Sequence, residues 1–560
     1  MHNTSTLRTN FYEIGPFSEP VTIDYKMPSD DILLKIFQQY LDTTPQLWPI
    51  LTRVCQRWRH IIMRSPLGLR LRLYCSYETP VLKNLDRWPP LPLVLNYGGY
   101  RVLKAPAPED NDNIICALKQ SDRVKAITLT LTNSLLEKVS TISEPLSELE
   151  ELVLLSEDKL QLTLPGTFRW GERLRTLHVT GIDIPTLPRL LSPSMDLVDL
   201  QLHEIPKVGC LYPQVFASAL SGASRLRSLS LHFLTFPPRR NYIGLPPPGH
   251  HILLPVLTSF KYRGISKYLD NFMARIDAPR LRDIEITFFS QPTMDVSQLG
   301  QFIVRIGMNT ALSEAEIQAS AHAVLISFKN SNTSTRLRLQ IPCKQLDWQI
   351  SSVAQICDQF SLFVLDVQHL VCIINDWSSV QDDVDGEQLL QLIRSFGSAR
   401  TISVAGELAT GILCALRPGD MGYTTDVAVL PALRTLRIQD PMPLNWPFWE
   451  AAQSLISARG LTCHPNDSEL QILCPICSTR FTPQGLKEHL VARHAYERVC
   501  SYCGDFRLTK GYTLRFQKHL SVKHPEVVQK DELISQSPST LTLLQRDTLI
   551  TRYISLRKKT

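Results

Sequence analysis

The first regular pattern of apolar residues along the chain is helical. Ser29 and the two aspartates behind it suit a helix start. Apolar residues then recur on one side of a helix, at Ile32, Leu33, Ile36, Phe37 and Leu41. After a break at 42–45, a second helical stripe runs from Leu47 to Ile62. Two such helices cannot build a core of any size, so their apolar faces must be covered by the next domain or by another molecule.

From about 120 to 440 the pattern changes to a short motif, apolar-x-x-apolar-x-apolar. Its copies begin at Leu149, Leu174, Leu197, Leu226, Leu257, Leu281 and Leu433. The first six starts lie 25, 23, 29, 31 and 24 residues apart. Each copy predicts a short strand that buries its apolar side chains only by stacking on the next one. Gln214–Leu220 and Glu387–Phe396 are helix-compatible stretches between strands, so an α/β fold is expected.

Ordinary βα units in a doubly wound sheet are the alternative, but no Gly-rich phosphate-binding loop follows any of these strands. The array is expected to be irregular. A Pro-rich run at 237–248 interrupts it, and residues 290–400 are its least regular stretch. The Asn or Cys of a regular leucine-rich repeat is replaced in the first four copies by Glu157, Ile182, Ile205 and Leu234.

Scattered polar residues of this region, His178, His203, His232 and Asp366, lie on strand-like segments. They could line a catalytic or metal-binding groove, or they could be hydrogen-bonded positions on half-buried strands. Neither a GxSxG elbow nor an HExxH motif occurs in the sequence. The second interpretation is therefore favoured, and no catalytic residue is predicted.

Charge and cysteine content change the picture near the C-terminus. The 560 residues carry 59 Lys and Arg against 53 Asp and Glu, a net charge of +6, and all of this excess lies between 471 and 530. No run approaches the ~18 apolar residues of a membrane helix, and the first residues do not resemble a secretion signal. Thirteen mostly scattered cysteines favour reduced thiols, in the cytoplasm or the nucleus.

Two copies of one Cys/His spacing lie in the basic segment. Each has a Cys-x-x-Cys pair followed by two histidines with four residues between them, which supplies two thiolates and two imidazoles for a tetrahedral Zn²⁺ site. The predicted ligands are Cys474, Cys477, His489 and His494 in the first site and Cys500, Cys503, His519 and His524 in the second. Residues 470–528 thus resemble a tandem pair of two-Cys, two-His zinc fingers, which implies two ββα units.

The zinc-finger resemblance also marks the positions that would contact nucleic acid. In the first finger these are Thr482, Gly485 and Glu488, a poor set for binding DNA. In the second they are Tyr512, Arg515 and Lys518, which could contact phosphate, a base or an acidic protein surface. Protein contact or weak nucleic-acid contact is favoured over sequence-specific DNA binding.

The opening helices resemble an F-box. The order Met27-Pro28, Ile36-Phe37-x-x-x-Leu41 and Val54-Cys55-x-x-Trp58 follows that family, with Met in place of Leu and one extra residue before Leu41. The resemblance implies docking onto the Skp adaptor of a cullin ubiquitin ligase, with Ile36 and Phe37 facing the adaptor. The residues implied in adaptor binding are Met27, Pro28, Ile32, Ile36, Phe37, Leu41, Val54 and Trp58.

The whole arrangement resembles fungal F-box proteins with leucine-rich repeats, whose repeat region recognises the substrate. It predicts a flexible tail (1–20), an all-α F-box-like domain (21–75), an irregular leucine-rich-repeat-like α/β solenoid (76–460), two zinc fingers (470–528) and a C-terminal helix or tail (529–560). The predicted function is that of a non-catalytic substrate-recognition adaptor of a Skp-cullin-F-box ligase. The alternative is a zinc-dependent nucleic-acid-binding regulatory protein.

Overall fold

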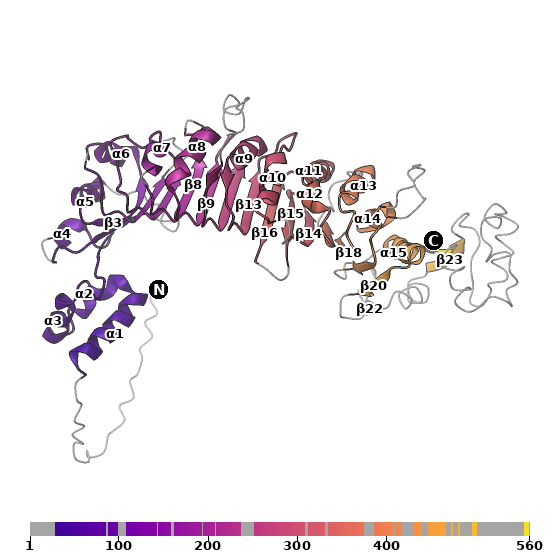
Figure 1. The fold of residues 1–560 in the computed structure, drawn as a ribbon. Coiled ribbons are helices and arrows are strands. Elements are labelled where there is room, and N and C mark those ends of the chain that lie inside the picture. Colours follow the sequence, from indigo (N-terminus) through magenta and orange to yellow (C-terminus); the bar gives the residue numbers. More distant parts are fainter. Residues whose placement is uncertain are drawn as a thin grey trace, which may run out of the picture. The chain divides into compact units, whose positions relative to one another are not determined.

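Helices and mostly parallel strands build both units of the chain in a computed structural model, Met1–Leu149 and Glu150–Thr560 (Figure 1). The structure describes residues 28–85, 88–98, 108–142, 144–157, 162–192, 194–207, 209–236, 251–308, 312–330, 334–374, 386–406, 409–416, 429–438, 446–465, 472–473, 480–481, 496–500 and 554–558. The α/β fold class expected from the sequence is confirmed.

Unit 1 begins with four helical elements. Three parallel strands follow, which pair in the order β1-β2-β3 and alternate with further helices. Its helical elements are α1 (Asp30–Thr43), η1 (Pro45–Leu47), α2 (Trp48–Leu51), α3 (Gln56–Arg64), α4 (Val81–Leu85), α5 (Pro108–Leu118) and α6 (Asn133–Val139). Its strands are β1 (Leu73–Cys75), β2 (Leu93–Tyr97) and β3 (Val124–Leu131). The F-box-like helices and these strands therefore share one compact unit, whereas the sequence places a domain boundary near residue 75.

Unit 2 contains a long sheet in the strand order β4-β6-β8-β9-β11-β13-β16-β15-β14-β17-β18-β19-β20. Its strands are β4 (Glu151–Ser156), β6 (Thr176–Thr180), β8 (Asp199–Ile205), β9 (Ser228–Phe233), β11 (Ser259–Gly264), β13 (Asp283–Phe288), β14 (Glu314–Ala319), β15 (Ala323–Lys329), β16 (Arg336–Pro342), β17 (His369–Ile374), β18 (Thr401–Gly406), β19 (Thr435–Ile438) and β20 (Thr462–Pro465). All seven copies of the leucine motif form strands, as predicted: β4, β6, β8, β9, β11, β13 and β19.

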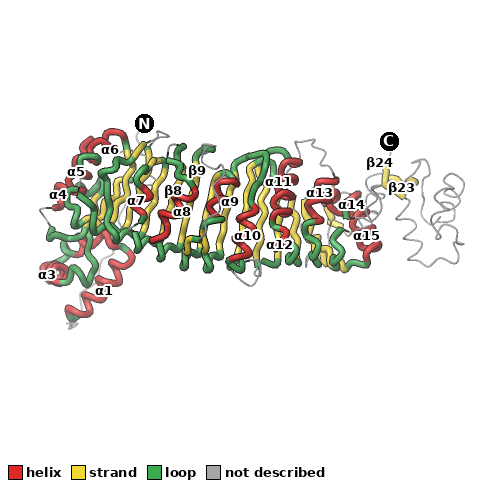
Figure 2. The backbone as a smooth tube through the Cα atoms, turned by 45° about the horizontal axis from the view of Figure 1, so that its top comes forward, coloured by secondary structure: helices red, strands yellow, loops and turns green. Residues whose placement is uncertain are grey.

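The helices of unit 2 lie along one face of this sheet (Figure 2). They are α7 (Leu187–Leu191), α8 (Pro213–Ala219), η2 (Leu220–Gly222), α9 (Ser266–Met273), α10 (Ser297–Arg305), α11 (Leu346–Gln359), α12 (Ser361–Val364), α13 (Gly386–Arg394), α14 (Ala409–Ala415) and α15 (Trp446–Arg459). The α8 and α13 ranges coincide with two predicted helical stretches. Strand residues alternate between buried and half-buried, because every second side chain points to the helix layer. The ring of Phe272 in α9 contacts both Phe216 of α8 and Phe260 of β11.

One antiparallel insertion breaks the parallel order, within the stretch expected to be irregular. β15 pairs antiparallel with both β14 and β16, while β16 pairs parallel with β13 and β14 with β17. The chain therefore passes from β13 to β14, three places away in the sheet, and returns through β15 and β16 before it continues to β17.

Four two-stranded pairs complete the fold. They are β5 (Leu162–Thr163) with β7 (Ile182–Asp183), β10 (Ile252–Leu253) with β12 (Ile276–Asp277), β21 (Ile472–Leu473) with β22 (Arg480–Phe481), and β23 (Tyr496–Cys500) with β24 (Ile554–Lys558). A C-terminal helix or tail is expected at 529–560. A helix is wrong for the end of this segment, because Ile554–Lys558 is a strand that pairs with Tyr496–Cys500.

Candidate functional site

The F-box-like helices are held together by one arginine and one aromatic pair. The Arg57 guanidinium donates to the Asp30 carboxylate (2.8 Å) and to the backbone carbonyl of Pro28 (2.7 Å), which ties α3 to the start of α1. The rings of Phe37 and Trp58 meet edge to face, with centroids 4.8 Å apart. The start of α1 is further fixed by the Ser29 hydroxyl, which accepts from the Ile32 N–H.

An apolar surface remains exposed on these helices. Ile32, Ile36 and Tyr40 follow one another at four-residue spacing on α1 and are 51%, 51% and 42% exposed. Ile50 at the end of α2 and Val54 just after it are 53% and 57% exposed. We call these five residues the apolar stripe. The three members on α1 stand next to one another along the helix, whereas exposed side chains of this size normally occur singly.

Two residues expected to contact the adaptor lie elsewhere. Phe37 is 1% exposed and Leu41 is 5% exposed, so both form the core between the helices. The expectation that Phe37 faces a partner beside Ile36 is therefore wrong in this structure. Adjacent residues on a helix point about 100° apart, and it is the ring of Phe37 that packs against Trp58.

The remaining predicted contacts divide in the same way. Val54 and Pro28 are exposed, and Trp58 is half-buried against Phe37. Met27 lies outside the described residues. Tyr40 and Ile50 belong to the apolar stripe although neither is among the predicted contacts. The helical periodicity of α1 could have found Tyr40, since it follows Ile36 by four residues.

The second predicted helix is divided in two at Val54-Cys55. Pro49 stands in the first turn of α2, and that helix ends at Leu51. Cys55 takes an extended conformation (φ −158°, ψ 169°) and its Sγ accepts from the Trp58 N–H at 3.5 Å, so Cys55 is the N-cap of α3. The Val-Cys-x-x-Trp segment therefore marks a helix start, and the break in the helix leaves Val54 exposed.

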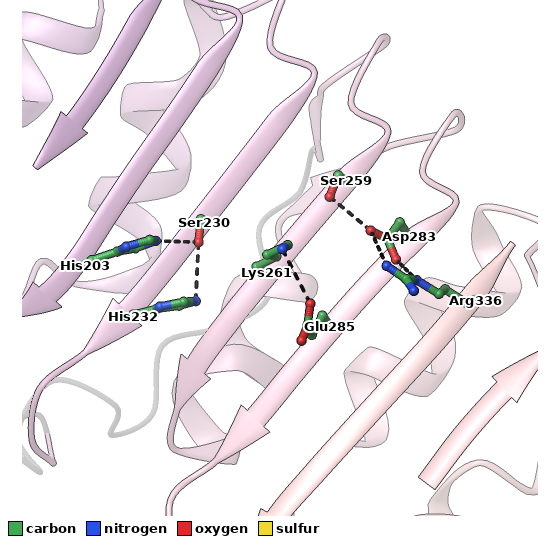
Figure 3. A network of polar contacts seen from close by, with 8 residues as sticks. All are labelled: His203, Ser230, His232, Ser259, Lys261, Asp283, Glu285 and Arg336. Atoms are coloured by element: carbon green, nitrogen blue, oxygen red, sulfur yellow. Dashed lines mark hydrogen bonds and ion pairs between the residues drawn. The ribbon is translucent and has the colours of Figure 1, made fainter. Parts of the chain in front are cut away.

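The second candidate surface is the sheet face of unit 2 that the helices leave open. The Nε2 of His178 on β6 lies 2.7 Å from an Asp199 carboxylate oxygen on β8. The hydroxyl of Ser230 on β9 bonds the Nε2 atoms of His203 (2.9 Å) and His232 (3.3 Å), and the two imidazole rings stack with centroids 4.2 Å apart (Figure 3).

Charged pairs continue this open face across the next strands. Lys261 of β11 lies 3.6 Å from Glu285 of β13, and the Ser259 hydroxyl donates to Asp283 at 3.3 Å (Figure 3). Arg336 of β16 also pairs with Asp283. The open face is thus a row of cross-strand polar pairs, which are the usual stabilising contacts of a sheet surface.

Burial disfavours the charged form of both stacked imidazoles. Burial, with His203, Arg263 and Lys261 nearby, lowers the pKa of His232 to about 4. Burial also lowers the pKa of His203. Burial of Asp199 opposes its ionisation, but hydrogen bonds from His178, Ser228 and Gln201 outweigh it and lower the pKa of that carboxyl.

These histidines agree with the interpretation of hydrogen-bonded positions on half-buried strands. Asp366 differs from the expectation, because it follows α12 in a turn where its N–H bonds the Phe363 carbonyl. Among the residues that the structure describes, no group of three or more His, Cys, Asp or Glu is arranged to hold a metal ion.

The predicted zinc ligands and the predicted nucleic-acid contacts lie almost entirely outside the described residues. Outside them are Cys474, Cys477, His489, His494, Cys503, His519, His524, Tyr512, Arg515 and Lys518. Cys500 is the last residue of β23. β21 and β22 pair antiparallel, with Ile472 opposite Phe481, and the segment between them contains the first Cys-x-x-Cys pair.

Comparison with models of known protein families finds no match, and comparison with curated proteins finds no significantly similar sequence. Within the described part of the chain, none of the helices has the length and apolar content needed to cross a membrane.

Proposed function

We propose that this protein is a non-catalytic substrate-recognition adaptor that docks onto the Skp component of a cullin ubiquitin ligase. The observation that supports this proposal most directly is the apolar stripe on α1 and α2. Its position on the segment that resembles an F-box supports an adaptor of that class. The chain would then act by holding a substrate beside the ligase.

The size of the stripe is compatible with a specific contact. Full burial of an Ile or Val side chain contributes about 1.5–3 kcal/mol, and each stripe residue is about half exposed. Covering Ile32, Ile36, Ile50 and Val54 therefore contributes roughly 3–6 kcal/mol before the cost of association is subtracted. A stripe of this kind can act as the anchor of an interface but needs a polar rim around it.

The proposal assigns substrate recognition to unit 2, as an irregular leucine-rich-repeat-like solenoid. Successive motifs give adjacent parallel strands, and the helices that the structure describes cover one face of their sheet (Figure 2). The open face carries polar side chains that are partly exposed, such as Lys261 and Arg263. This arrangement supports a surface for polar contacts with another protein.

The proposal also includes two zinc fingers at 470–528 that contact a partner. The antiparallel pairing of β21 with β22 around the first Cys-x-x-Cys pair supports the first finger, because ββα fingers begin with such a hairpin. We expect two zinc ions per chain by native mass spectrometry and one in the Cys474→Ser/Cys477→Ser variant. A chain that binds no zinc after refolding with excess metal would reject this part of the proposal.

The adaptor role is tested by co-purification of the full chain with a Skp-family adaptor. The variant Ile32→Asp/Ile36→Asp places two charges in the stripe, and we expect it to lose the adaptor at least tenfold. The matched control is Leu67→Asp/Leu82→Asp, which changes two exposed leucines of the same unit outside the stripe (90% and 54% exposed).

Equal thermal stability of the two double variants shows that binding, and not folding, is being compared. Adaptor binding that survives Ile32→Asp/Ile36→Asp, or that is lost equally in the control, contradicts the adaptor role. The alternative of a zinc-dependent nucleic-acid-binding protein predicts that neither pair of substitutions matters.

A further inference from the structure

Arginines recur at one edge of the unit 2 sheet, where each parallel strand begins. The residue before the strand is Arg175 for β6, Arg227 for β9 and Arg282 for β13. Between them, at the same position of β8 and β11, stand Val198 and Thr258. Each of these residues lies on one side of a buried leucine of the repeat motif, so the sequence repeat itself directs this position away from the core.

Backbone hydrogen bonds fix the distance between these arginines. The N–H of Val198 bonds the Arg175 carbonyl at 2.8 Å, and the N–H of Arg227 bonds the Val198 carbonyl at 2.8 Å. The same ladder runs through Thr258 (2.9 Å) to Arg282 (3.1 Å). Since neighbouring strands lie ~4.8 Å apart, the three arginine backbones are spaced by about 9.6 Å.

The three guanidinium groups are available for binding. Arg175, Arg227 and Arg282 are all exposed, and within the described part of the chain their side chains form no hydrogen bond or ion pair. Three more arginines stand on the other side of the buried leucines, at 173, 225 and 280. Two acids belong to the same edge: Glu150 stands directly before β4, where its carbonyl accepts from the Arg175 N–H at 2.8 Å, and Asp196 is paired with Arg225 at 2.8 Å.

A groove follows the same edge. It has a volume of about 470 Å³ and is lined by Arg175, Asp196, Val198, Arg225, Arg227 and Val256. Its lining thus combines two valines with three arginines, of which Arg225 is paired with Asp196, and Arg282 is not among the lining residues. A bound segment can therefore pair its charges with the arginines and place a small apolar group on Val198 or Val256.

We propose that this edge binds an extended acidic peptide that carries an acidic side chain at every third residue. A polyproline II segment has three residues per turn and rises ~3.1 Å per residue, so its acidic side chains would face one side at intervals of about 9.3 Å. That interval matches the arginine spacing. Arginine forks bind carboxylates in two parallel hydrogen bonds, which favours such pairing.

A single-stranded nucleic acid is the less favoured occupant. Proteins that bind single strands combine a basic groove with aromatic side chains on which bases stack. The described residues that line this groove include no aromatic side chain, and Asp196 would face the phosphates. The site is distinct from the open strand face, and the inference does not depend on the adaptor role.

The test uses the full zinc-loaded chain and fluorescence anisotropy with three labelled probes. The first is a peptide with Glu at every third position of a proline-rich sequence, the second has the same composition with its glutamates contiguous, and the third is oligothymidine of equal charge. We expect the first peptide to bind at least several-fold more tightly than the second, with an affinity that falls as salt is raised.

Substitutions locate the site. In Arg175→Glu/Arg227→Glu/Arg282→Glu the affinity for the first peptide should fall by about tenfold or more. The control with the same charge change is Lys207→Glu/Lys267→Glu/Lys344→Glu, exposed lysines of unit 2 away from this edge, which should lose less than about threefold. If the first variant is destabilised, the milder Arg175→Gln/Arg227→Gln/Arg282→Gln variant should still lose affinity.

Three results would overturn the inference. Equal binding of the two peptides would remove the spacing argument, and equal losses in the arginine and lysine variants would move the contact away from this edge. Oligothymidine binding that depends on the three arginines and exceeds peptide binding would assign the groove to nucleic acid.

Discussion

The F-box-like helices and the open strand face differ in how their side chains are satisfied. On the helices, Ile32, Ile36 and Val54 stay about half exposed, although burial of apolar side chains of this size is favourable. On the strand face, His203 and His232 share Ser230, and Lys261 faces Glu285. The helices expose apolar side chains that another molecule could bury, whereas the polar side chains of the strand face already have partners. The helices are therefore the stronger candidate for a protein interface.

The largest effect that sharpens this comparison is expected within α1. Phe37→Ala removes a buried ring from its contact with Trp58 and should cost about 3–5 kcal/mol. Ile36→Ala changes a half-exposed neighbour and should cost no more than roughly 0.5 kcal/mol. Hydrogen exchange of residues 30–64 measures both.

Equal amide protection in the two variants would contradict this contrast, since it would mean that Phe37 and Ile36 contribute equally to the stability of the helices. The same contrast explains why an adaptor test should avoid Phe37. A charge at that position unfolds the helices and removes binding for a reason unrelated to the interface.

A smaller effect is expected on the strand face, as a dependence of stability on pH. His232 has a pKa of about 4 in the folded chain against 6.5 in the unfolded chain. Between these two pKa values the imidazole is protonated in the unfolded state but not in the folded state. The free energy of unfolding therefore falls as pH drops from about 6.5 towards 4. The contribution of this half-buried group is on the order of 2 kcal/mol.

Urea denaturation at pH 7 and at pH 4.5 measures this dependence. His232→Gln should reduce the loss of stability between the two values, whereas His369→Gln, at an exposed position of β17, should leave the loss unchanged. A loss of the same size in all three proteins would show that the stacked imidazoles do not control the acid response.

Much of the fold could be predicted from the sequence because its strongest signals are local. The leucine motifs at Leu174 and Leu226 give strands β6 and β9, and the apolar periodicity of 387–396 gives α13. The antiparallel insertion could not be predicted in the same way. Its strands alternate well enough, but their pairing joins β14 to β17 across more than fifty residues, which no local pattern specifies.

The candidate site divides along a similar line. Periodicity places Ile36 and Phe37 together among the apolar residues of the first predicted helix, but it does not tell which of the two another helix covers. That depends on Trp58, which reaches Phe37 only because Cys55 restarts the helix. The arginine edge is present in the sequence as Arg175, Arg227 and Arg282, each directly after a motif leucine, but the distances between them require the register of the strands.

The reversed order of β16, β15 and β14 also sets the distance that the chain must cross after β16. To pass from β16 to β17 the chain must cross three strand spacings, about 14 Å, and the 14 residues of α11 extend about 21 Å. From β11 to β13, by comparison, the chain crosses a single spacing. The sheet therefore cannot extend from β13 by adding one repeat at a time. We expect residues 314–342 to fold together, and to unfold together under mechanical force, as one unit.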